Sequence, residues 1–406
     1  MIEGRKVKGE FSRGWKVLLG SFIGMGVSIV SLSYYAGGIW VKPWQDAFGW
    51  SRTEIGTGQS LSTLVIVLTA PFAGRLIDRY GLRSVATVSL FLYGLVLWTT
   101  SQMTGSLWMF YSLMILTTLV GVASSPIAFT RAINGWFNKH RGLALGLSLT
   151  STGVAAFLIP RYLTPYVATE GWRSGFFVLF CIVMIAVPIV WLLIRDQPEG
   201  RGDMDDAKKV LSGATFKEAT KTRTFWTMSI LFFLIAFAVL GLIPSFIPLL
   251  QDAGFTPAKA GAMAGIMGLS VMIGRIITGL LVDRIFAPYV TAVIFTLVAF
   301  GCLALGLGGI DYALPAAIAL GMAIGAEADL IGFFTARYFG LKNYGTIYGF
   351  QYSMFSLGAA TSPIVAGYIW DVTGDYDVAL IGASILLGIS VIIALTLPRF
   401  KDEITL

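Results

Sequence analysis

Apolar runs of about 20 residues follow one another along almost the whole chain. A helix needs about 20 apolar residues to cross the ~30 Å hydrocarbon core of a bilayer, and irregular backbone is not tolerated against lipid. Charged residues make up only 13% of the 406 residues, whereas a soluble globular protein carries roughly 25%. The sequence therefore predicts an all-α polytopic membrane protein.

Twelve runs have the length of a membrane-spanning helix. They cover residues 15–41, 53–75, 83–103, 107–134, 142–166, 173–195, 223–250, 257–282, 288–309, 312–336, 345–370 and 377–398. The chain also contains 47 glycines and 14 prolines, which are tolerated in membrane helices because they permit close packing and local unwinding. We expect helices that can move against one another.

A single long polar segment divides these runs into two halves of six helices. We expect a cytoplasmic segment at residues 1–14, a first half at 15–195, a cytoplasmic linker at 196–222, a second half at 223–398 and a cytoplasmic tail at 399–406. The halves repeat each other. Gly74, Asp78 and Arg79 recur as Gly279, Asp283 and Arg284 at an offset of 205, and Trp136, Phe137, Gly142 and Gly146 recur as Tyr338, Phe339, Gly345 and Gly349 at 202 to 203.

Lysine and arginine are concentrated on one side of the predicted membrane. They precede the first run, fill the polar linker, follow the last run and lie between runs two and three and runs four and five. By the positive-inside rule, both termini are expected in the cytoplasm and the protein in the plasma (inner) membrane. This bias accounts for the net charge of +7, so no nucleic-acid partner is expected. Cys181, Cys302 and His140 lack neighbours that would form a metal site, and we expect neither a metal nor a cofactor.

A ten-residue segment after the second run resembles a known family motif. Gly74-Arg75-Leu76-Ile77-Asp78-Arg79-Tyr80-Gly81-Leu82-Arg83 is similar to the loop motif G-x-x-x-D-R-x-G-x-R of the major facilitator superfamily. The glycine would let two helices touch, and the arginines would mark the cytoplasmic side. The resemblance implies a fold of twelve helices in two halves with a substrate site between them near the membrane midplane.

Within that superfamily the chain resembles the monocarboxylate transporter and oxalate:formate antiporter group over most of its length. Four strings carry this resemblance: residues 48–55 (FGWSRTEI), residues 136–146 (WFNKHRGLALG), residues 171–173 (GWR) and Gly274-Arg275-x-x-x-Gly279. In that group the arginine of helix eight binds the substrate carboxylate, and the resemblance assigns this role to Arg275. Two features depart from the group, because Val271 stands where animal members have an aspartate and Gln351 where oxalate antiporters have a second cation.

Arg275 is informative without the resemblance, because it lies inside an apolar run. A guanidinium stays charged, so a membrane helix keeps one only where it meets a wet cavity and a partner. Arg275 lies eight residues before Asp283, about 12 Å from that end at ~1.5 Å per residue, and Asp329 lies at nearly the same depth before Arg337. Glu327 is two residues from Asp329, so the two carboxylates should point to different faces of their helix. We favour Asp329 as the proton-coupling partner of Arg275 and keep Glu327 as the alternative.

Polar and aromatic residues at helical spacing supply further candidates for the substrate site. Tyr348, Gln351 and Tyr352 recur at three- and four-residue spacing on the eleventh run, and Tyr35 shares a face with Ser28 and Ser31 on the first. Such stripes serve helix packing equally well. We keep Tyr35, Tyr348, Gln351 and Tyr352 as candidates on these terms.

The sequence favours a secondary active transporter of small monocarboxylates such as lactate or pyruvate. We expect a monomer that carries one organic anion with a proton by alternating access. Alternatives are an exchanger of two organic anions and a carrier of a zwitterion such as an aromatic amino acid. A membrane enzyme or receptor is disfavoured, because no nucleophile, metal-ligand or phosphate-binding pattern is present.

Overall fold

The computed structural model describes residues 10–137, 140–195, 213–282, 284–340 and 342–400. In this part of the chain the secondary structure is helical, and the β-pairing is an isolated antiparallel bridge between Gly213 and Gly340. The expectation of an all-α fold is confirmed.

The described residues of the first half form nine α-helices and two short 3-10 helices, several of which combine into one span. They are α1 (Glu10–Gly26), α2 (Ile29–Ala36), η1 (Gly37–Ile39), α3 (Val41–Phe48), α4 (Arg52–Tyr80), α5 (Leu82–Ser101), α6 (Leu107–Gly121), η2 (Val122–Ser124), α7 (Pro126–Trp136), α8 (Arg141–Glu170) and α9 (Trp172–Leu193).

The second half begins with a short helix and continues with long ones. Its elements are α10 (Phe216–Ala219), α11 (Arg223–Leu240), α12 (Leu242–Asp252), α13 (Pro257–Val282), α14 (Ala287–Gly308), η4 (Gly309–Tyr312), α15 (Ala313–Phe339), α16 (Tyr344–Thr373) and α17 (Asp377–Leu395).

The helix boundaries follow local sequence signals. At the start of α4, the Ser51 hydroxyl accepts from the Glu54 backbone N–H at 3.1 Å, and the Glu54 carboxylate accepts from the Ser51 N–H at 2.8 Å. This reciprocal capping satisfies two N–H groups that the helix itself leaves unpaired. After α4, Gly81 has φ of 81°, which suits glycine and turns the chain directly into α5.

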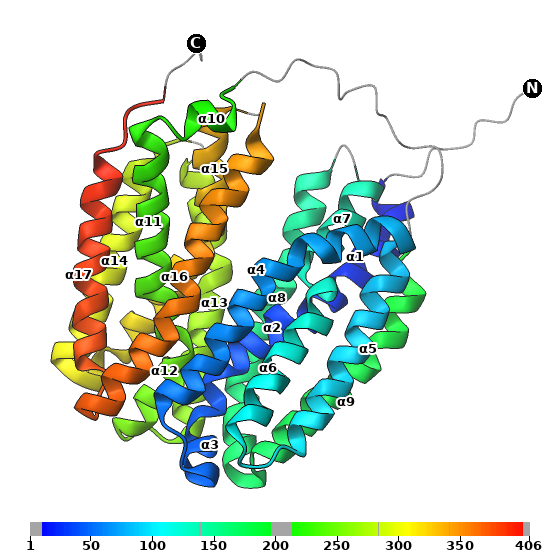
Figure 1. Cartoon of the computed structure of the whole chain (residues 1–406), viewed down its shortest axis with the longest axis vertical. Helices are drawn as coiled ribbons and strands as arrows, with labels where there is room; N and C mark the ends of the chain where they lie inside the picture. The colour runs from blue at the N-terminus through cyan, green and yellow to red at the C-terminus, as the bar shows by residue number, and fades with distance from the viewer. Residues whose placement is uncertain (1–9, 138–139, 196–212, 283, 341, 401–406) are drawn as a thin grey trace, which may run out of the picture.

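The two halves use the same scheme of helix pairing. In the first half α1 packs on α8, α4 on α6 and α5 on α9; in the second α11 packs on α16, α13 on α15 and α14 on α17. Figure 1 shows the halves side by side, α1–α9 in blue to green and α10–α17 in green to red. They diverge toward the end where α1 begins and α17 ends, and they meet near α3 and α12.

Glycine environments show where the halves touch. An added Cβ would press on the other half's backbone at Gly56 (against Pro363), Gly367 (against Arg52) and Gly261 (against Pro160). A Cβ at Gly74, Gly146, Gly279 or Gly349 would meet no atom within 4 Å. The region of these close contacts is remote from the start of α1 and the end of α17, and we call it the closed end. The region around the four glycines with open space is called the open end.

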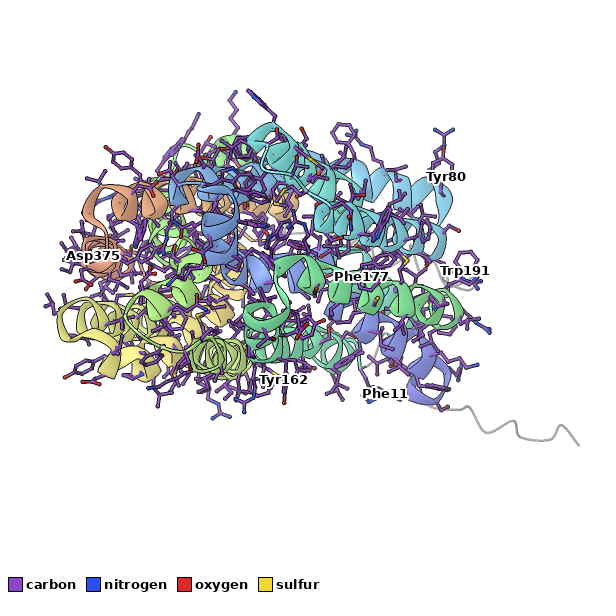
Figure 2. The ribbon with its side chains drawn as sticks, turned by 90° about the horizontal axis from the view of Figure 1, so that it is seen from below. Phe11, Tyr80, Tyr162, Phe177, Trp191 and Asp375 are labelled. Carbon is purple, nitrogen blue, oxygen red and sulfur yellow. The ribbon has the colours of Figure 1, made fainter. Side chains whose placement is uncertain are left out.

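The exterior is apolar, as a lipid-facing surface requires. Large side chains such as Tyr162 (64% exposed), Leu192 (67%) and Val293 (62%) lie on it, and Figure 2 shows Tyr162 and Trp191 at the edge of the molecule. Among the described residues, nine helical stretches are long and apolar enough to cross a membrane, one of them containing both α14 and the first part of α15. The 29-residue α4 and the 30-residue α16 are not among these nine, and they pack on each other between the halves.

Candidate functional site

Arg275 of α13 and Asp329 of α15 form an ion pair. The Arg275 Nε lies 3.4 Å from Asp329 Oδ2, and the two side chains are 32% and 46% exposed. Within the described chain, this Nε donates no hydrogen bond of good geometry. The pair is therefore held mainly by charge, and hydrogen-bonding capacity remains on both partners.

Small residues explain why these two helices come close enough to form the pair. Gly321 and Gly325, four residues apart on α15, lie against the backbone of α13 at Met267 and Val271. Gly274 of α13 lies against the backbone of α15, where an added Cβ would be 2.6 Å from the Met322 Cα. Such glycines permit direct backbone contact between membrane helices. They place Arg275 next to the α15 turn that carries Asp329.

Arg275 lies where the closed end gives way to the open end. Met272, one turn earlier on α13, packs on α8, and its Cβ would be 3.1 Å from a Cβ at Gly153. One turn later, Gly279 has open space around it. Across the interface, Tyr35 of α2 is near enough to interact electrostatically with Arg275 and Glu327. Arg275 thus lies at the innermost depth that the open end reaches, near Tyr35 of the first half.

Glu327 occupies a different environment from Asp329. Its side chain is 2% exposed, and its Oε1 has no hydrogen-bond partner among the described residues. The Tyr34 hydroxyl is also buried without such a partner, and Tyr34 interacts electrostatically with Glu327. Helical spacing on the first run predicted only its neighbour Tyr35 as a site residue, so Tyr34 is an addition from the structure.

Three candidates on α16 separate into two groups. Gln351 is fully buried, and its Nε2 donates to the Phe225 carbonyl at 3.2 Å while its Oε1 accepts from the Ser229 hydroxyl at 3.2 Å. Its amide joins α16 to α11 in this structure, and its contact with substrate stays a prediction. Tyr348 and Tyr352 stay beside the site, since Tyr348 interacts electrostatically with Asp329 and Tyr352 with Tyr34.

The loop motif lies at the open end. Arg83 donates from Nε to the Trp191 carbonyl at 2.8 Å, its guanidinium lies 4.1 Å from the Trp191 ring, and Arg79 lies 5.3 Å from the Tyr80 ring. The expected helix contacts at Gly74 and Gly279 are not made, because the halves are apart there. Arg284 is exposed, whereas Asp283 and the side chain of Asp78 lie outside the described residues.

Arg52, which lies in one of the strings that carry the family resemblance, anchors the closed end. Arg52 is 3% exposed and donates to Asp252 of the second half, which also lies 2.9 Å from Lys42. Its guanidinium stacks 3.7 Å from the Trp370 ring, and its backbone N–H donates to Asp371 at 3.0 Å. The Asp371 carboxylate thus caps α4 from the opposite half, and its negative charge interacts favourably with the positive end of the helix dipole.

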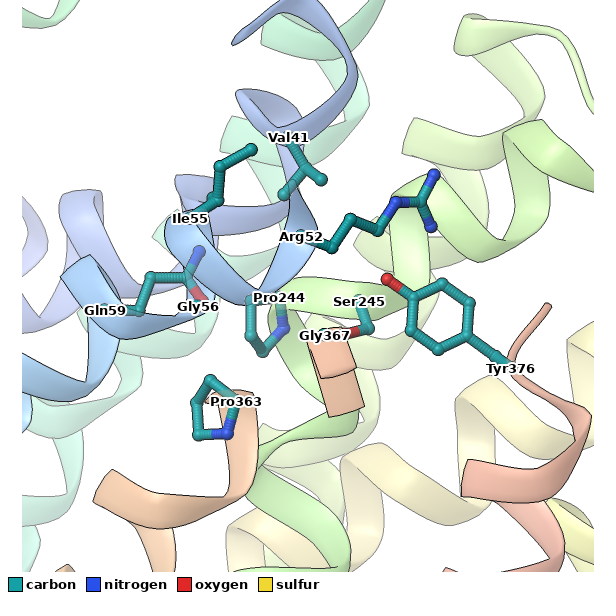
Figure 3. Close-up of a pocket in the computed structure, with 10 residues that line it drawn as sticks. All are labelled: Val41, Arg52, Ile55, Gly56, Gln59, Pro244, Ser245, Pro363, Gly367 and Tyr376. Carbon is teal, nitrogen blue, oxygen red and sulfur yellow. The ribbon is translucent and has the colours of Figure 1, made fainter. Parts of the chain in front are cut away.

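The surroundings of Arg52 are closely packed. Figure 3 shows its side chain directed toward Tyr376 beside Ser245, and the cavity bounded by these residues has a volume of about 10 Å³. That volume is about the minimum for one water molecule. Burial raises the pKa of Tyr376, although the nearby Arg52 opposes this. A neutral phenol and an arginine with charged partners therefore seal the closed end.

Comparison with known proteins agrees with this architecture. The sequence model of the Major Facilitator Superfamily matches residues 17–363. Monocarboxylate transporter 13 of Rattus norvegicus is 23% identical, with 97% of this chain and 91% of that protein covered. The 3-(3-hydroxy-phenyl)propionate transporter of Escherichia coli (strain K12) is 24% identical, with 84% and 83% covered.

A solved structure shows the same fold. A bacterial homologue of the human lysosomal transporter Spinster, in an inward-facing and occupied conformation, matches with a TM-score of 0.76 at 14% identity, over 97% of this chain and 98% of that one. The family match extends over most of the chain, and the two-half helical architecture agrees with it. The chain belongs to the Major Facilitator Superfamily, as a multi-pass membrane transporter of organic substrates and not an enzyme.

Proposed function

We propose that this transporter carries a small organic monocarboxylate together with a proton. The observation that carries the proposal is the Arg275–Asp329 pair, which is partly exposed and faces the other half at the inner limit of the open end. Charged groups in membrane helices are costly and mark substrate pathways when they meet across a bundle. A single arginine with a displaceable carboxylate suits one anionic group.

The substrate carboxylate binds Arg275 in competition with Asp329. A guanidinium presents two parallel N–H groups to a carboxylate, a geometry that the single 3.4 Å approach of Asp329 does not use. A substrate that enters from the open end can form the bidentate pair, and Tyr35 can donate its hydroxyl from the first half. Substrate binding thereby connects the two halves.

Asp329 links this binding step to a proton. When the substrate takes the guanidinium, Asp329 loses its counter-charge and takes up a proton from the open end. The arginine then balances the substrate anion, and the site moves without uncompensated charge. Glu327 is the second carboxyl group, and its burial beside Tyr34 and Tyr35 suits a protonated acid, because an unpaired ion is costly to bury.

The names of the relatives support a carboxylate substrate. One is a monocarboxylate transporter, and the other is a transporter of 3-(3-hydroxy-phenyl)propionate. A second candidate function is transport of a zwitterion such as an aromatic amino acid. The 46% exposure of the Asp329 side chain favours it, because this carboxylate could accept an ammonium group while Arg275 holds the carboxylate. Exchange of two organic anions is a third possibility, in which neither carboxyl group carries a proton.

We also propose the topology of the working protein. The lysines and arginines before α1, between α9 and α10 and after α17 support cytoplasmic termini, which makes the open end cytoplasmic. The substrate site needs no second copy, so we propose a monomer in the plasma membrane. Rocking of the halves would open the Arg52 end and close the opposite one.

Uptake by proteoliposomes tests the proposal. Radiolabelled lactate, pyruvate and 3-phenylpropionate would be offered with and without an inward proton gradient. We expect the gradient to accelerate uptake of at least one acid, and Arg275→Ala to abolish that uptake. Arg223→Ala, which removes an exposed arginine at the first residue of α11, should keep it. Gradient-driven uptake that survives Arg275→Ala would overturn the proposal.

A further inference from the structure

Four aromatic residues form a continuous stack along α16. The ring centroids of Tyr344 and Tyr348 are 5.6 Å apart, those of Tyr348 and Tyr352 are 5.9 Å apart, and those of Tyr352 and Phe355 are 5.7 Å apart. The interplanar angles are 19°, 18° and 29°. Spacings of four, four and three residues keep all four rings on one helix face. We call these residues the aromatic ladder.

The ladder passes beside the Arg275–Asp329 pair. At its Tyr344 end it lies over α15, because a Cβ at Gly332 would be 3.1 Å from the Tyr344 hydroxyl and 3.8 Å from the Tyr348 ring. Tyr348 interacts electrostatically with Asp329. Tyr352 interacts with Tyr34 of the first half and is nevertheless 39% exposed. The exposed surface of Tyr352 therefore borders the space between the halves.

The ladder differs from tyrosines that serve packing. Tyr338 donates its hydroxyl to the Pro398 carbonyl at 2.8 Å, and the hydroxyl of Tyr93 lies 2.8 Å from that of Ser33. For Tyr348 and Tyr352 no hydrogen-bond partner occurs among the described residues. Helix packing requires only the rings of these two tyrosines. Their hydroxyls, which lack a partner in the described part of the chain and lie beside a cationic site, can bind a ligand.

A second aromatic surface lies across the interface. Tyr34 and Tyr35 of α2 meet edge to face, with centroids 5.5 Å apart and an interplanar angle of 79°. Tyr35 interacts with Arg275 and Tyr34 with Tyr352, so this pair spans the distance between the cation and the ladder. Aromatic rings prefer offset-stacked or edge-to-face neighbours, and these two surfaces offer both. A flat ring fits here better than an alkyl chain.

We propose that the substrate is an aryl-substituted monocarboxylate, with its carboxylate on Arg275 and its ring against Tyr348 and Tyr352. This inference rests on the proposed function, since it takes Arg275 as the carboxylate site. The ring is separated from the carboxylate by a short chain, because the ladder is beside Asp329 and Asp329 is beside Arg275. Stacking contributes a preference of roughly three- to tenfold over a saturated ring of similar size.

Matched acids test this inference on the reconstituted full chain. The KM of proton-driven uptake would be compared for 3-phenylpropionate, 3-cyclohexylpropionate and butyrate, which share the carboxylate and differ in the ring. We expect the KM for the phenyl acid to be about three- to tenfold lower than that for the cyclohexyl acid. Equal KM values for these two acids would overturn the inference while leaving monocarboxylate transport intact. Failure of every acid would overturn the proposed function with it.

Variants of the aromatic ladder test whether its rings cause the lower KM for the phenyl acid. Tyr352→Leu should reduce the ratio of the two KM values toward one, and Tyr352→Phe should retain it because the ring remains. Tyr368→Leu is the control, since Tyr368 lies on the same helix and is 61% exposed. A ratio unchanged in Tyr352→Leu and Tyr348→Leu would contradict the assignment. Lower KM for phenylalanine than for 3-phenylpropionate would overturn the proton-coupled function instead, because Asp329 would then bind an ammonium group.

Discussion

At the scale of single residues, the site depends on glycine as much as on charge. Arg275 reaches Asp329 because Gly274, Gly321 and Gly325 remove the side chains that would hold α13 and α15 apart. The sequence predicted nearly equal depths for Arg275 and Asp329, because each lies eight residues before a charged residue at the end of its helix. It favoured Asp329 over Glu327 by depth alone, because the face that each carboxylate occupies depends on how α15 is rotated against its neighbours.

Gly325→Ala tests the packing that sets this geometry. The added Cβ would press on the Val271 carbonyl and lie 2.8 Å from the Arg275 backbone nitrogen, so α15 must shift. We expect a loss of about 1–3 kcal/mol, as for other overpacked sites, seen as a lower midpoint of thermal unfolding in detergent. Gly382→Ala is the matched control on α17, where a Cβ meets nothing within 4 Å. Equal midpoints for the two variants would contradict the account.

At the scale of helices, the antiparallel contact between α8 of the first half and α13 of the second half explains why the molecule is closed at one end and open at the other. On α8 and α13, Gly261 packs on Pro160, Gly265 on Phe157 and Met272 on Gly153. Seven further residues toward the open end, about two turns, bring Gly279 opposite Gly146, and both have open space in this structure. The sequence identified both glycines from the repeat. It could not show that they are separated here, since one sequence serves both conformations.

Gly146→Leu tests whether these positions meet during transport. The side chain fits the present open end, so the thermal midpoint should match that of Gly388→Leu, a control on α17 with similarly open space. Transport should fall at least tenfold, because a leucine opposite Gly279 prevents close helix contact when the open end shuts. Uptake at the rate of the control would show that α8 and α13 do not approach each other at this level.

At the scale of the whole molecule, composition and repeat predicted the fold and the structure assigned the contacts. The apolar runs and the internal repeat were sufficient for two helical halves of the Major Facilitator Superfamily. The role of Arg52 could not be predicted, because its partners Asp252 and Asp371 are 200 and 319 residues away in sequence. The hydrogen bonds of Gln351 to α11 could not be predicted for a related reason, since the helix that packs on α16 was unknown.

The central claim is that substrate binding at Arg275 transfers a proton to Asp329. The most direct measurement is the internal pH of proteoliposomes loaded with a pH-sensitive dye. The acid transported fastest would be added at equal internal and external pH, and the signal of protein-free liposomes would be subtracted. We predict that the native chain acidifies the interior as substrate enters, and that Asp329→Asn does not, while Asp311→Asn, an exposed carboxylate in η4, behaves as the native chain. Substrate entry without acidification in the native chain, or undiminished acidification in Asp329→Asn, would contradict the account.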